Sequence, residues 1–289
     1  MADSENMSGK TCVVTGANAG IGKETARALA HRGAHVVLVC RNGPKGEAAM
    51  EEIRRESGST RLDLLIADMS SMESVRALAS EMQKRYPRLD VLLNNAGAAL
   101  QKRTLSTDGI EMTIAGNHLG PALLTLLLRD LLKASAPSRV INVSSEAQRH
   151  ARLDLNDLQF ERRKYSGFAA YGQSKLLMNA FTFELARRLE TSGVTANCLH
   201  PGVVRTNIGG TSPGLLFKII VAAIRPFMLD PKQGAEGSVY LASSPAVSQV
   251  SGKYFVKCKP AEPNPLLRDP KVWTAIWEWT EKMTGHHWE

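Results

Sequence analysis

Short continuous runs of hydrophobic residues alternate along the chain with longer amphipathic segments. Continuous apolar runs are typical of strands that are buried on both faces of a parallel sheet. The predicted strands span residues 11–15, 35–40, 62–67, 89–93, 139–143, 194–199 and 254–257. The predicted helices, in which apolar residues recur at helical spacing, span residues 23–32, 45–56, 70–85, 109–133, 168–190 and 233–242. This order predicts an α/β fold with a single doubly wound parallel β-sheet flanked by helices.

Two local signals refine the predicted helices. Ser70 and Glu73 have the S-x-x-E spacing of a capping box, so we expect them to open the third helix. Pro121 lies inside the fourth predicted helix, where a proline kinks or ends the hydrogen-bond ladder. We therefore expect one long helix with a kink at this proline.

The chain is predicted to form one domain, because no internal repeat and no Pro/Gly/Ser-rich linker divides it. This domain covers residues 9–258 and follows a polar tail of residues 1–8. The remaining residues, 259–289, form a C-terminal extension that is first Pro-rich and then helical, with Trp273, Trp277 and Trp279 close together. The plainest interpretation is a helix that covers a surface patch, and a partner interface or a membrane contact are the alternatives.

Composition and charge narrow the class of protein. The 289 residues carry a formal net charge of +8 and have a pI of about 9.4. The basic side chains are scattered apart from Arg162-Arg163-Lys164, and no RNA-binding motif accompanies this run, so no nucleic-acid partner is expected. The four cysteines have no C-x-x-C spacing, which predicts free thiols and no metal site in a reducing compartment. The polar N-terminus and the lack of an apolar run of about 18 residues predict a cytoplasmic protein.

A glycine-rich segment connects the first predicted strand to the first predicted helix. It reads G-x-x-x-G-x-G, with Gly16, Asn18, Gly20, Ile21 and Gly22 as the candidate cofactor contacts. Glycines allow the backbone to approach a pyrophosphate, and the free N–H groups of the following helix favour an anion. This spacing differs from the common G-x-G-x-x-G pattern, but its place in a strand–turn–helix unit predicts a Rossmann-type dinucleotide site. The alternative is a turn without function.

The end of the second predicted strand indicates which dinucleotide binds. An acidic residue there would bind the ribose 2′-hydroxyl of NAD, whereas a basic residue accommodates the 2′-phosphate of NADP. The chain has Arg41 at this place and no carboxylate. We therefore expect NADP(H) to be preferred over NAD(H), with a plain surface arginine as the alternative.

Further motifs carry a resemblance to a known family. Asn94-Asn95-Ala96-Gly97 follows the fourth strand, and Tyr171-Gly172-Gln173-Ser174-Lys175 opens a helix. With these motifs in this order, the chain resembles the short-chain dehydrogenase/reductase superfamily from about residue 9 to residue 257. Within it, the segments 15–26, 117–120 and 200–206 are most similar to the retinol dehydrogenase-like group.

The predicted catalytic residues are Asn117, Ser145, Tyr171 and Lys175. Tyr171 and Lys175 lie four residues apart on one helix face, and a nearby ammonium is expected to lower the phenol pKa so that it can exchange a proton with an alcohol or carbonyl. By the resemblance, Ser145 would hydrogen-bond the reacting oxygen and Ser144 would cap a turn; a register shifted by one residue, which would exchange the two roles, is the alternative. The resemblance implies that Lys175 also binds the nicotinamide ribose and that Asn117 holds a relay water. We interpret His118 as structural.

The resemblance also implies the remaining cofactor contacts. Asp68 would contact the adenine, although capping the following helix explains this residue equally well. The other residues predicted to line the cofactor are Met69, Asn95, Ala96, Gly97, Pro201, Val204 and Thr206.

The segment after Thr206 is expected to select the substrate. It forms an apolar lid over residues 206–232, which favours a small apolar carbonyl or alcohol such as a retinoid, a steroid or a lipid aldehyde. Residues 215–229 could instead pack on the protein body, on a second subunit or on a membrane surface. The resemblance implies a homodimer or homotetramer through the helix at 168–190.

The sequence therefore predicts an NADP(H)-dependent oxidoreductase that transfers a hydride between the nicotinamide and a carbonyl or alcohol. Two alternatives remain. The same scaffold could reduce an activated double bond or a pigment, or it could bind NADPH as a non-catalytic regulatory protein.

Overall fold

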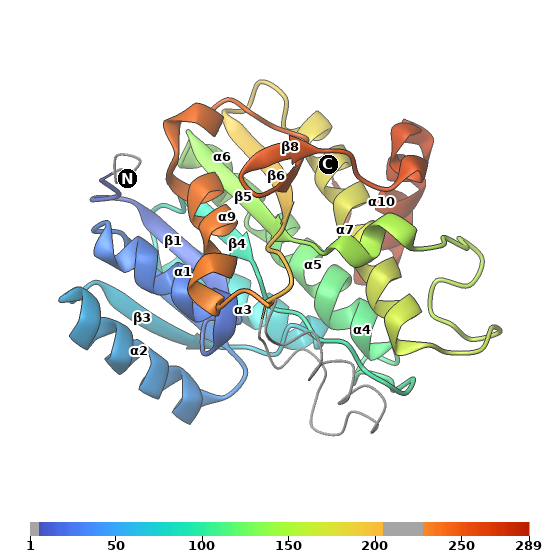
Figure 1. Ribbon diagram of the computed structural model, residues 1–289, viewed down its shortest axis with the longest axis horizontal. Coiled ribbons are helices and arrows are strands. Elements are labelled where there is room, and N and C mark those ends of the chain that lie inside the picture. The colour runs from blue at the N-terminus through green and yellow to red at the C-terminus, as the bar shows by residue number, and fades with distance from the viewer. Residues whose placement is uncertain (1–5, 205–227, 289) are drawn as a thin grey trace.

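A single twisted sheet forms the centre of the computed structural model, which describes residues 6–204 and 228–288 (Figure 1). The eight strands are hydrogen-bonded in the order β3-β2-β1-β4-β5-β6-β7-β8. All neighbouring pairs are parallel except β7 and β8. The strands are β1 Thr11–Thr15, β2 His35–Cys40, β3 Leu62–Ile66, β4 Val91–Asn94, β5 Ser138–Val143, β6 Val194–His200, β7 Tyr254–Val256 and β8 Lys259–Ala261.

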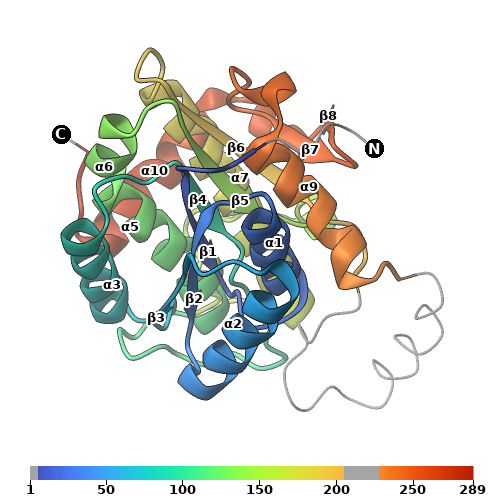
Figure 2. The same cartoon turned by 90° about the vertical axis from the view of Figure 1, so that its left-hand side faces the viewer.

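Helices cover both faces of this sheet. They are α1 Gly20–His31, α2 Gly43–Ser57, α3 Met72–Arg85, α4 Met112–Ile114, α5 Gly120–Leu127, α6 Arg129–Ala134, α7 Gly167–Arg188, α9 Pro231–Ser243 and α10 Pro270–Thr284. One π-helix is present in the described residues, η1 Ala115–Leu119. The short 3-10 helices in the same part of the chain are η2 Glu146–His150, η4 Pro245–Val247 and η5 Pro265–Arg268. Helices α1, α2 and α9 lie on one face, and α3, α5 and α7 lie on the other (Figure 2). The predicted doubly wound fold is therefore confirmed.

The strands are apolar throughout because each face of the sheet carries its own core. In β1, Val13 packs into the core beneath α3, α5 and α7, whereas Cys12 and Val14 pack into the core beneath α1 and α9. All of these side chains are fully buried. Cys12, Cys40, Cys198 and Cys258 are free thiols, as predicted.

Two predictions about the helices were wrong. Helix α3 begins at Met72, two residues after the predicted start, and its N-cap is Ser71 in place of Ser70; the Ser71 side chain accepts a hydrogen bond from the amide of Ser74. Ser70 instead donates its hydroxyl to Asp68. The long helix expected at 109–133 starts at Met112 and is divided into α4, η1, α5 and α6. The interruption precedes Pro121, because the π-helix lies before Gly120 and the proline stands in the first turn of α5.

The C-terminal extension packs on the body of the domain and contributes Leu267, Ile276 and Trp277 to its core. Its first residues form β8, a strand that the sequence did not predict, at the edge of the same sheet. Helix α10 then lies along α7 (Figure 1), and the fully buried indole of Trp277 stacks on Phe181 with ring centroids 5.0 Å apart. Helix α7 also packs on β5 and β6, so it lies between the sheet and α10. A homodimer or homotetramer remains a prediction.

Several predictions concern residues outside the described part of the chain. Thr206, most of the expected lid at 206–232 and most of the expected membrane-facing segment at 215–229 fall there. Among the residues that are described, no helix has the length and apolar composition needed to cross a bilayer.

Candidate active site

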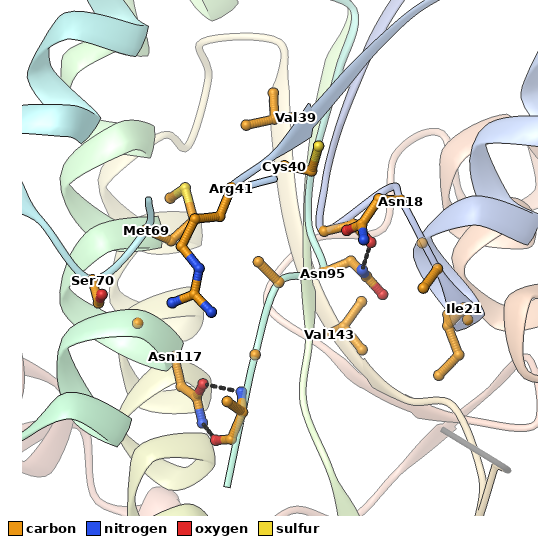
Figure 3. A pocket seen from close by; sticks show the side chains of 18 of the residues that line it. Asn18, Ile21, Val39, Cys40, Arg41, Met69, Ser70, Asn95, Asn117 and Val143 are labelled. Carbon is orange, nitrogen blue, oxygen red and sulfur yellow. Dashed lines mark hydrogen bonds between the residues drawn. The ribbon is translucent and has the colours of Figure 1, made fainter. Parts of the chain in front are cut away.

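A cavity of about 570 Å³ opens at the carboxyl ends of β1, β2, β4 and β5 (Figure 3). This is where an open α/β sheet binds its ligand. Most of the predicted site residues line it: Gly16, Asn18, Gly20, Ile21, Gly22, Arg41, Asp68, Met69, Asn95, Ala96, Gly97, Asn117, Tyr171, Lys175 and Pro201. The fold therefore brings together residues that the sequence spreads over much of its length.

The glycine-rich turn is pressed against the segment that follows β4. Gly16 has a positive φ of 68°, and a Cβ built on it would lie 3.0 Å from Cα of Ala96. A Cβ on Gly22 would lie only 2.4 Å from the backbone oxygen of Gly16. Asn95 fixes the two segments, since its side-chain amide donates to the oxygen of Thr15 at 2.8 Å. The result is a narrow backbone cradle at the start of α1, which suits a pyrophosphate.

Thr15 is a site residue that sequence analysis missed. Its fully buried hydroxyl accepts hydrogen bonds from the amides of Asn95 and Ala96, each at 3.0 Å. The position reads as an ordinary β-branched strand residue, so no local pattern reveals it. The cavity also includes Ala98, Leu100, Met112 and Gly116, which have no recognisable motif.

Arg41 extends from the end of β2 over the side of the cavity that holds Met69 and Ser70 (Figure 3). Its guanidinium lies 3.5 Å from the carboxylate of Asp68, and its side chain is 75% exposed. Asp68 in turn accepts hydrogen bonds from the amide and the hydroxyl of Ser70. Although partial burial opposes it, hydrogen bonding from Ser70 and the charge of Arg41 lower the pKa of Asp68. This edge of the cavity thus presents an exposed cation beside a fixed carboxylate.

Asn117 lies in the π-helix and ties it to the segment after β4. Its side-chain oxygen accepts from the amide of Ala98 at 2.8 Å, and its amide donates to the oxygen of Ala98 and to Ser174. A Cβ on Gly97 would lie 3.2 Å from both the side-chain oxygen of Asn117 and Nζ of Lys175. Only a glycine at this position lets these two polar groups approach the same point of the cavity wall.

His118 is buried on the far side of the same π-helix. Its Nε2 lies 2.8 Å from Oγ1 of Thr280, and the ring stacks on Trp279. Burial lowers the pKa of this imidazole to about 3. The interpretation of His118 as a structural residue agrees with this geometry, because the ring points away from the cavity into α10.

Tyr171 and Lys175 project from α7 into the cavity. Lys175 is buried, and its Nζ donates to the backbone oxygen of Val143 at 2.8 Å. Burial lowers the pKa of this ammonium to about 8. Burial also raises the pKa of the Tyr171 phenol, and a hydrogen bond with Ser145 partly opposes that shift. The expectation that Lys175 would lower the phenol pKa is therefore wrong for this structure, since the ammonium faces the strand and the ring rather than the hydroxyl.

The capping role that we expected of Ser144 belongs to Ser145. Ser145 caps η2, since its hydroxyl oxygen accepts from the amide of Ala147 at 3.2 Å, and it also meets the phenol of Tyr171. Ser144, which we expected to be the capping residue, is buried and lines the cavity. Ser145 thus joins the start of η2 to Tyr171, and its catalytic role stays a prediction.

Val204 and Pro201 lie on the third side of the site. Pro201 lines the cavity, whereas Val204 is buried between Ile21 and Ala235 and is not part of the lining. A Cβ on Gly234 would lie 2.6 Å from Val204. Val204 therefore packs α9 against the start of α1, beside the glycine-rich turn. No group of His, Cys, Asp and Glu side chains within the described ranges is arranged to hold a metal ion.

Comparison with known proteins agrees with this geometry. The family model described as short chain dehydrogenase matches residues 10–213. Human retinol dehydrogenase 13 is 43% identical over 288 residues, which cover 96% of this chain and 85% of that protein. Human retinol dehydrogenase 12 is 41% identical over 281 residues, covering 97% of this chain and 88% of that protein. The crystal structure of a Mycobacterium paratuberculosis protein is similar with a TM-score of 0.81 and 32% identity, covering 100% of this chain and 98% of the other.

The sheet order and the cavity at its carboxyl edge define a Rossmann-type oxidoreductase that uses a nicotinamide cofactor and acts on alcohols or carbonyls. More specifically, the chain belongs to the short-chain dehydrogenase family, and its relatives there include retinol dehydrogenases.

Proposed function

We propose that this protein is an NADP(H)-dependent oxidoreductase that interconverts a carbonyl and an alcohol on a small apolar substrate. The observation that carries the proposal is the hydrogen bond between the Tyr171 phenol and Ser145, beside the cavity that Tyr171 and Lys175 line. A proton donor and a second hydroxyl that meet in this way can both bind one oxygen atom of a substrate.

The cofactor would lie along the cavity, with its pyrophosphate on the cradle formed by Gly16 and Gly22. That cradle fits such a group, because a side chain at either glycine would fill the space. When bound, the nicotinamide supplies or accepts the hydride. Lys175 would bind the nicotinamide ribose, and Arg41 and Asp68 would lie at the adenosine end.

In the direction of reduction, the phenol of Tyr171 donates a proton to the carbonyl oxygen of the substrate. Ser145 donates a hydrogen bond to the same oxygen and stabilises the negative charge that develops there. Burial raises the pKa of the phenol, so Tyr171 carries its proton near neutral pH before the substrate binds. In the direction of oxidation, the phenolate accepts the alcohol proton.

Lys175 and Asn117 would complete the proton path. The ammonium, with its pKa near 8, can lose and regain a proton close to neutral pH. It lies beside the backbone of Val143 and near the Asn117 side chain, since both groups approach the same point at Gly97. We propose that Asn117 holds the water through which Lys175 exchanges protons with solvent.

The residues that line the cavity support a cofactor preference and a substrate class. The exposed guanidinium of Arg41 suits a 2′-phosphate, although the nearby Asp68 reduces the net positive charge there. Leu100 and Met112 contribute apolar surface to the lining. The retinol dehydrogenases among the relatives support an apolar alcohol or aldehyde as substrate.

The test is consumption of NADPH and NADH by purified protein against retinal, decanal, a steroid ketone and a quinone. Turnover of an apolar aldehyde or ketone with NADPH is the expected result. Reduction of a carbon–carbon double bond instead, seen in product analysis, would replace the carbonyl reaction by a different one on the same scaffold. Tight NADPH binding without turnover of any carbonyl would favour a regulatory protein.

A further inference from the structure

The turn that carries Ser145 is fixed by hydrogen bonds to its neighbours on several sides. The amide of Glu146 donates to Nδ1 of His200 at 3.2 Å, which joins the turn to the end of β6. The hydroxyl of Tyr254, on β7, donates to the carboxylate of Glu146 at 3.2 Å. The first residue of η2 is therefore attached to two strands of the sheet.

Helix α7 closes on the same turn from the side of Tyr171. A Cβ built on Gly172 would lie 2.8 Å from the backbone oxygen of Ala147. Ala147 is also the residue whose amide donates to Ser145. A shift of Ala147 would therefore disturb both its contact with α7, next to Tyr171, and its hydrogen bond to Ser145.

Asn264, from the C-terminal extension, holds the other end of the turn. Its side-chain amide donates to the backbone oxygens of Gln148 at 2.8 Å, Ala151 at 3.0 Å and Arg149 at 3.2 Å. Its own backbone amide donates to the side-chain oxygen of Gln148 at 2.9 Å. Asn264 and Gln148 are both buried, with 3% and 0% of their surface exposed.

The oxygen of Gln148 also accepts a hydrogen bond from the amide of Ala151 at 3.2 Å, whereas the Asn264 amide joins all three oxygens to the C-terminal extension. A buried peptide oxygen that loses its donor costs free energy comparable to a hydrogen bond, so the turn would rearrange to find water or another donor. The Asn264 side chain supplies several such bonds at once. Asn264 thus attaches the segment that begins at Ser145 to the C-terminal extension, in addition to its bonds to β6 and β7.

We propose that Asn264 is a positioning residue that holds the Ser145 turn against Tyr171, so that the C-terminal extension takes part in building the catalytic site. This inference rests on the proposed function in one respect, the role of Ser145 at the reacting oxygen. The positioning itself does not depend on which substrate is turned over.

The extension supports the opposite wall of the site as well. Thr280, on α10, donates its hydroxyl to the oxygen of Ile276, so its Oγ1 can only accept from Nε2 of His118. His118 directly follows Asn117 in the π-helix η1. Asn117 is therefore the neighbour of a residue that contacts the C-terminal extension. Ser145 begins the turn to which Asn264 of the same extension is hydrogen-bonded.

The test uses Asn264→Ser in the full-length protein. Asn264 also caps η5, where its side-chain oxygen accepts from the amide of Leu266. Serine is a good capping residue but is too short to reach three carbonyl oxygens, so this change removes the bonds to the turn and keeps the cap. Asn264→Asp, which keeps the shape and loses the amide donors, is the second variant. Trp273→Phe is the matched control, because it removes a hydrogen bond within the extension, from the indole to Leu267.

The first measurement is amide hydrogen exchange by mass spectrometry, which needs no substrate. In Asn264→Ser, the amides of residues 147–151 should exchange at least about tenfold faster, a ratio that corresponds to ~1.4 kcal/mol. The second measurement is the pH profile of kcat for alcohol oxidation. Because the bond from Ser145 lowers the pKa of Tyr171, the profile should move to higher pH, and kcat should fall by about tenfold to a hundredfold with an unchanged Kd for NADPH.

Both measurements can fail separately. If the exchange of residues 147–151 in both Asn264 variants equals that in Trp273→Phe, Asn264 does not position the turn and the inference is overturned. If exchange increases but kcat and its pH profile match the control, the turn moves without consequence for Tyr171, and the inference is overturned as well. If the wild-type protein turns over no alcohol or carbonyl, the proposed function fails, whereas faster exchange in this segment would still support the positioning.

Discussion

The ammonium of Lys175 lies 2.8 Å from the backbone oxygen of Val143, the last residue of β5. The same ammonium is 5.7 Å from the centre of the Tyr171 ring. Lys175 therefore joins the catalytic helix to the strand that leads into Ser144 and Ser145. In this arrangement, burial determines the pKa of both groups: it lowers the pKa of the amine and raises that of the phenol.

Tyr171→Phe should reduce turnover by about 10²–10⁴-fold, because the ring remains and only the proton donor is lost. NADPH binding, measured by fluorescence titration, should not change. Tyr165→Phe is a matched control: its hydroxyl bonds to Glu111 at 3.0 Å and is not part of the cavity lining. A Tyr171→Phe protein that retains more than a few per cent of wild-type kcat would exclude the assigned role.

Arg41→Asp should shift the ratio of kcat/KM for NADPH and NADH towards NADH by at least about tenfold, or ~1.4 kcal/mol. A carboxylate there would repel the 2′-phosphate and could bind the 2′-hydroxyl of NAD. Arg61→Asp makes the same change of charge at an exposed position outside the cavity lining and serves as the control. Equal shifts in the two variants would mean that net charge, and not the position of Arg41, sets the preference.

Gly22→Ala should weaken NADPH binding and lower the melting temperature. The added methyl group would lie 2.4 Å from the backbone oxygen of Gly16, and a backbone atom cannot move aside as a flexible side chain can. Gly237→Ala is the comparison within α9, where the nearest atom would be the methyl of Leu199 at 3.5 Å. That change should be neutral or stabilising by up to about 1 kcal/mol, because alanine favours helix. Titration of NADPH against the wild type, Gly22→Ala and Gly237→Ala measures whether only the change at Gly22 weakens binding.

Lys175→Met should abolish catalysis and change how stability depends on pH. The pKa of Lys175 falls from an ordinary 10.5 to about 8 in the folded protein. Between these values the unfolded chain holds a proton that the native protein has lost, so wild-type stability rises with pH relative to the variant, by about 1–3 kcal/mol in total. Urea unfolding of both proteins at pH 7 and at pH 10 measures this difference. If the difference in unfolding free energy between the two proteins is the same at pH 7 and at pH 10, burial does not lower the pKa of Lys175.

Trp277→Ala should cost about 3–5 kcal/mol in the free energy of unfolding, since a large and fully buried side chain leaves a cavity against Phe181. Phe168→Ala removes an aromatic side chain that is 72% exposed and should change stability by less than about 0.5 kcal/mol. Comparable losses in the two variants would show that α10 does not form part of the core.

The sequence predicted the sheet and its helices well because local pattern and burial agree there. Each apolar run from β1 to β6 became a strand, since both faces of the sheet are covered. The glycine-rich turn, Arg41 and the pair Tyr171 and Lys175 were found from their spacing, and the structure places all of them around one cavity.

The errors arose where long-range contacts override local signals. Ser70 has the spacing of a cap, but its hydroxyl bonds to Asp68, so the helix begins at the next serine. The π-helix depends on contacts of Asn117 with Ala98, a residue from another segment. Asn264 stands in a proline-rich stretch with no motif, and only the folded chain brings it to the Ser145 turn.

The packing of α10 on α7 has a consequence for the order in which the protein can be made. Chains are synthesised from the N-terminus at about 5–20 residues per second, so α7 leaves the ribosome well before α10. Phe181 then has no Trp277 to stack on, and its apolar side stays uncovered until the extension follows. The nascent protein should therefore depend on chaperones during this interval, and mutations in α10 should reduce its yield in cells before they alter its catalytic rate.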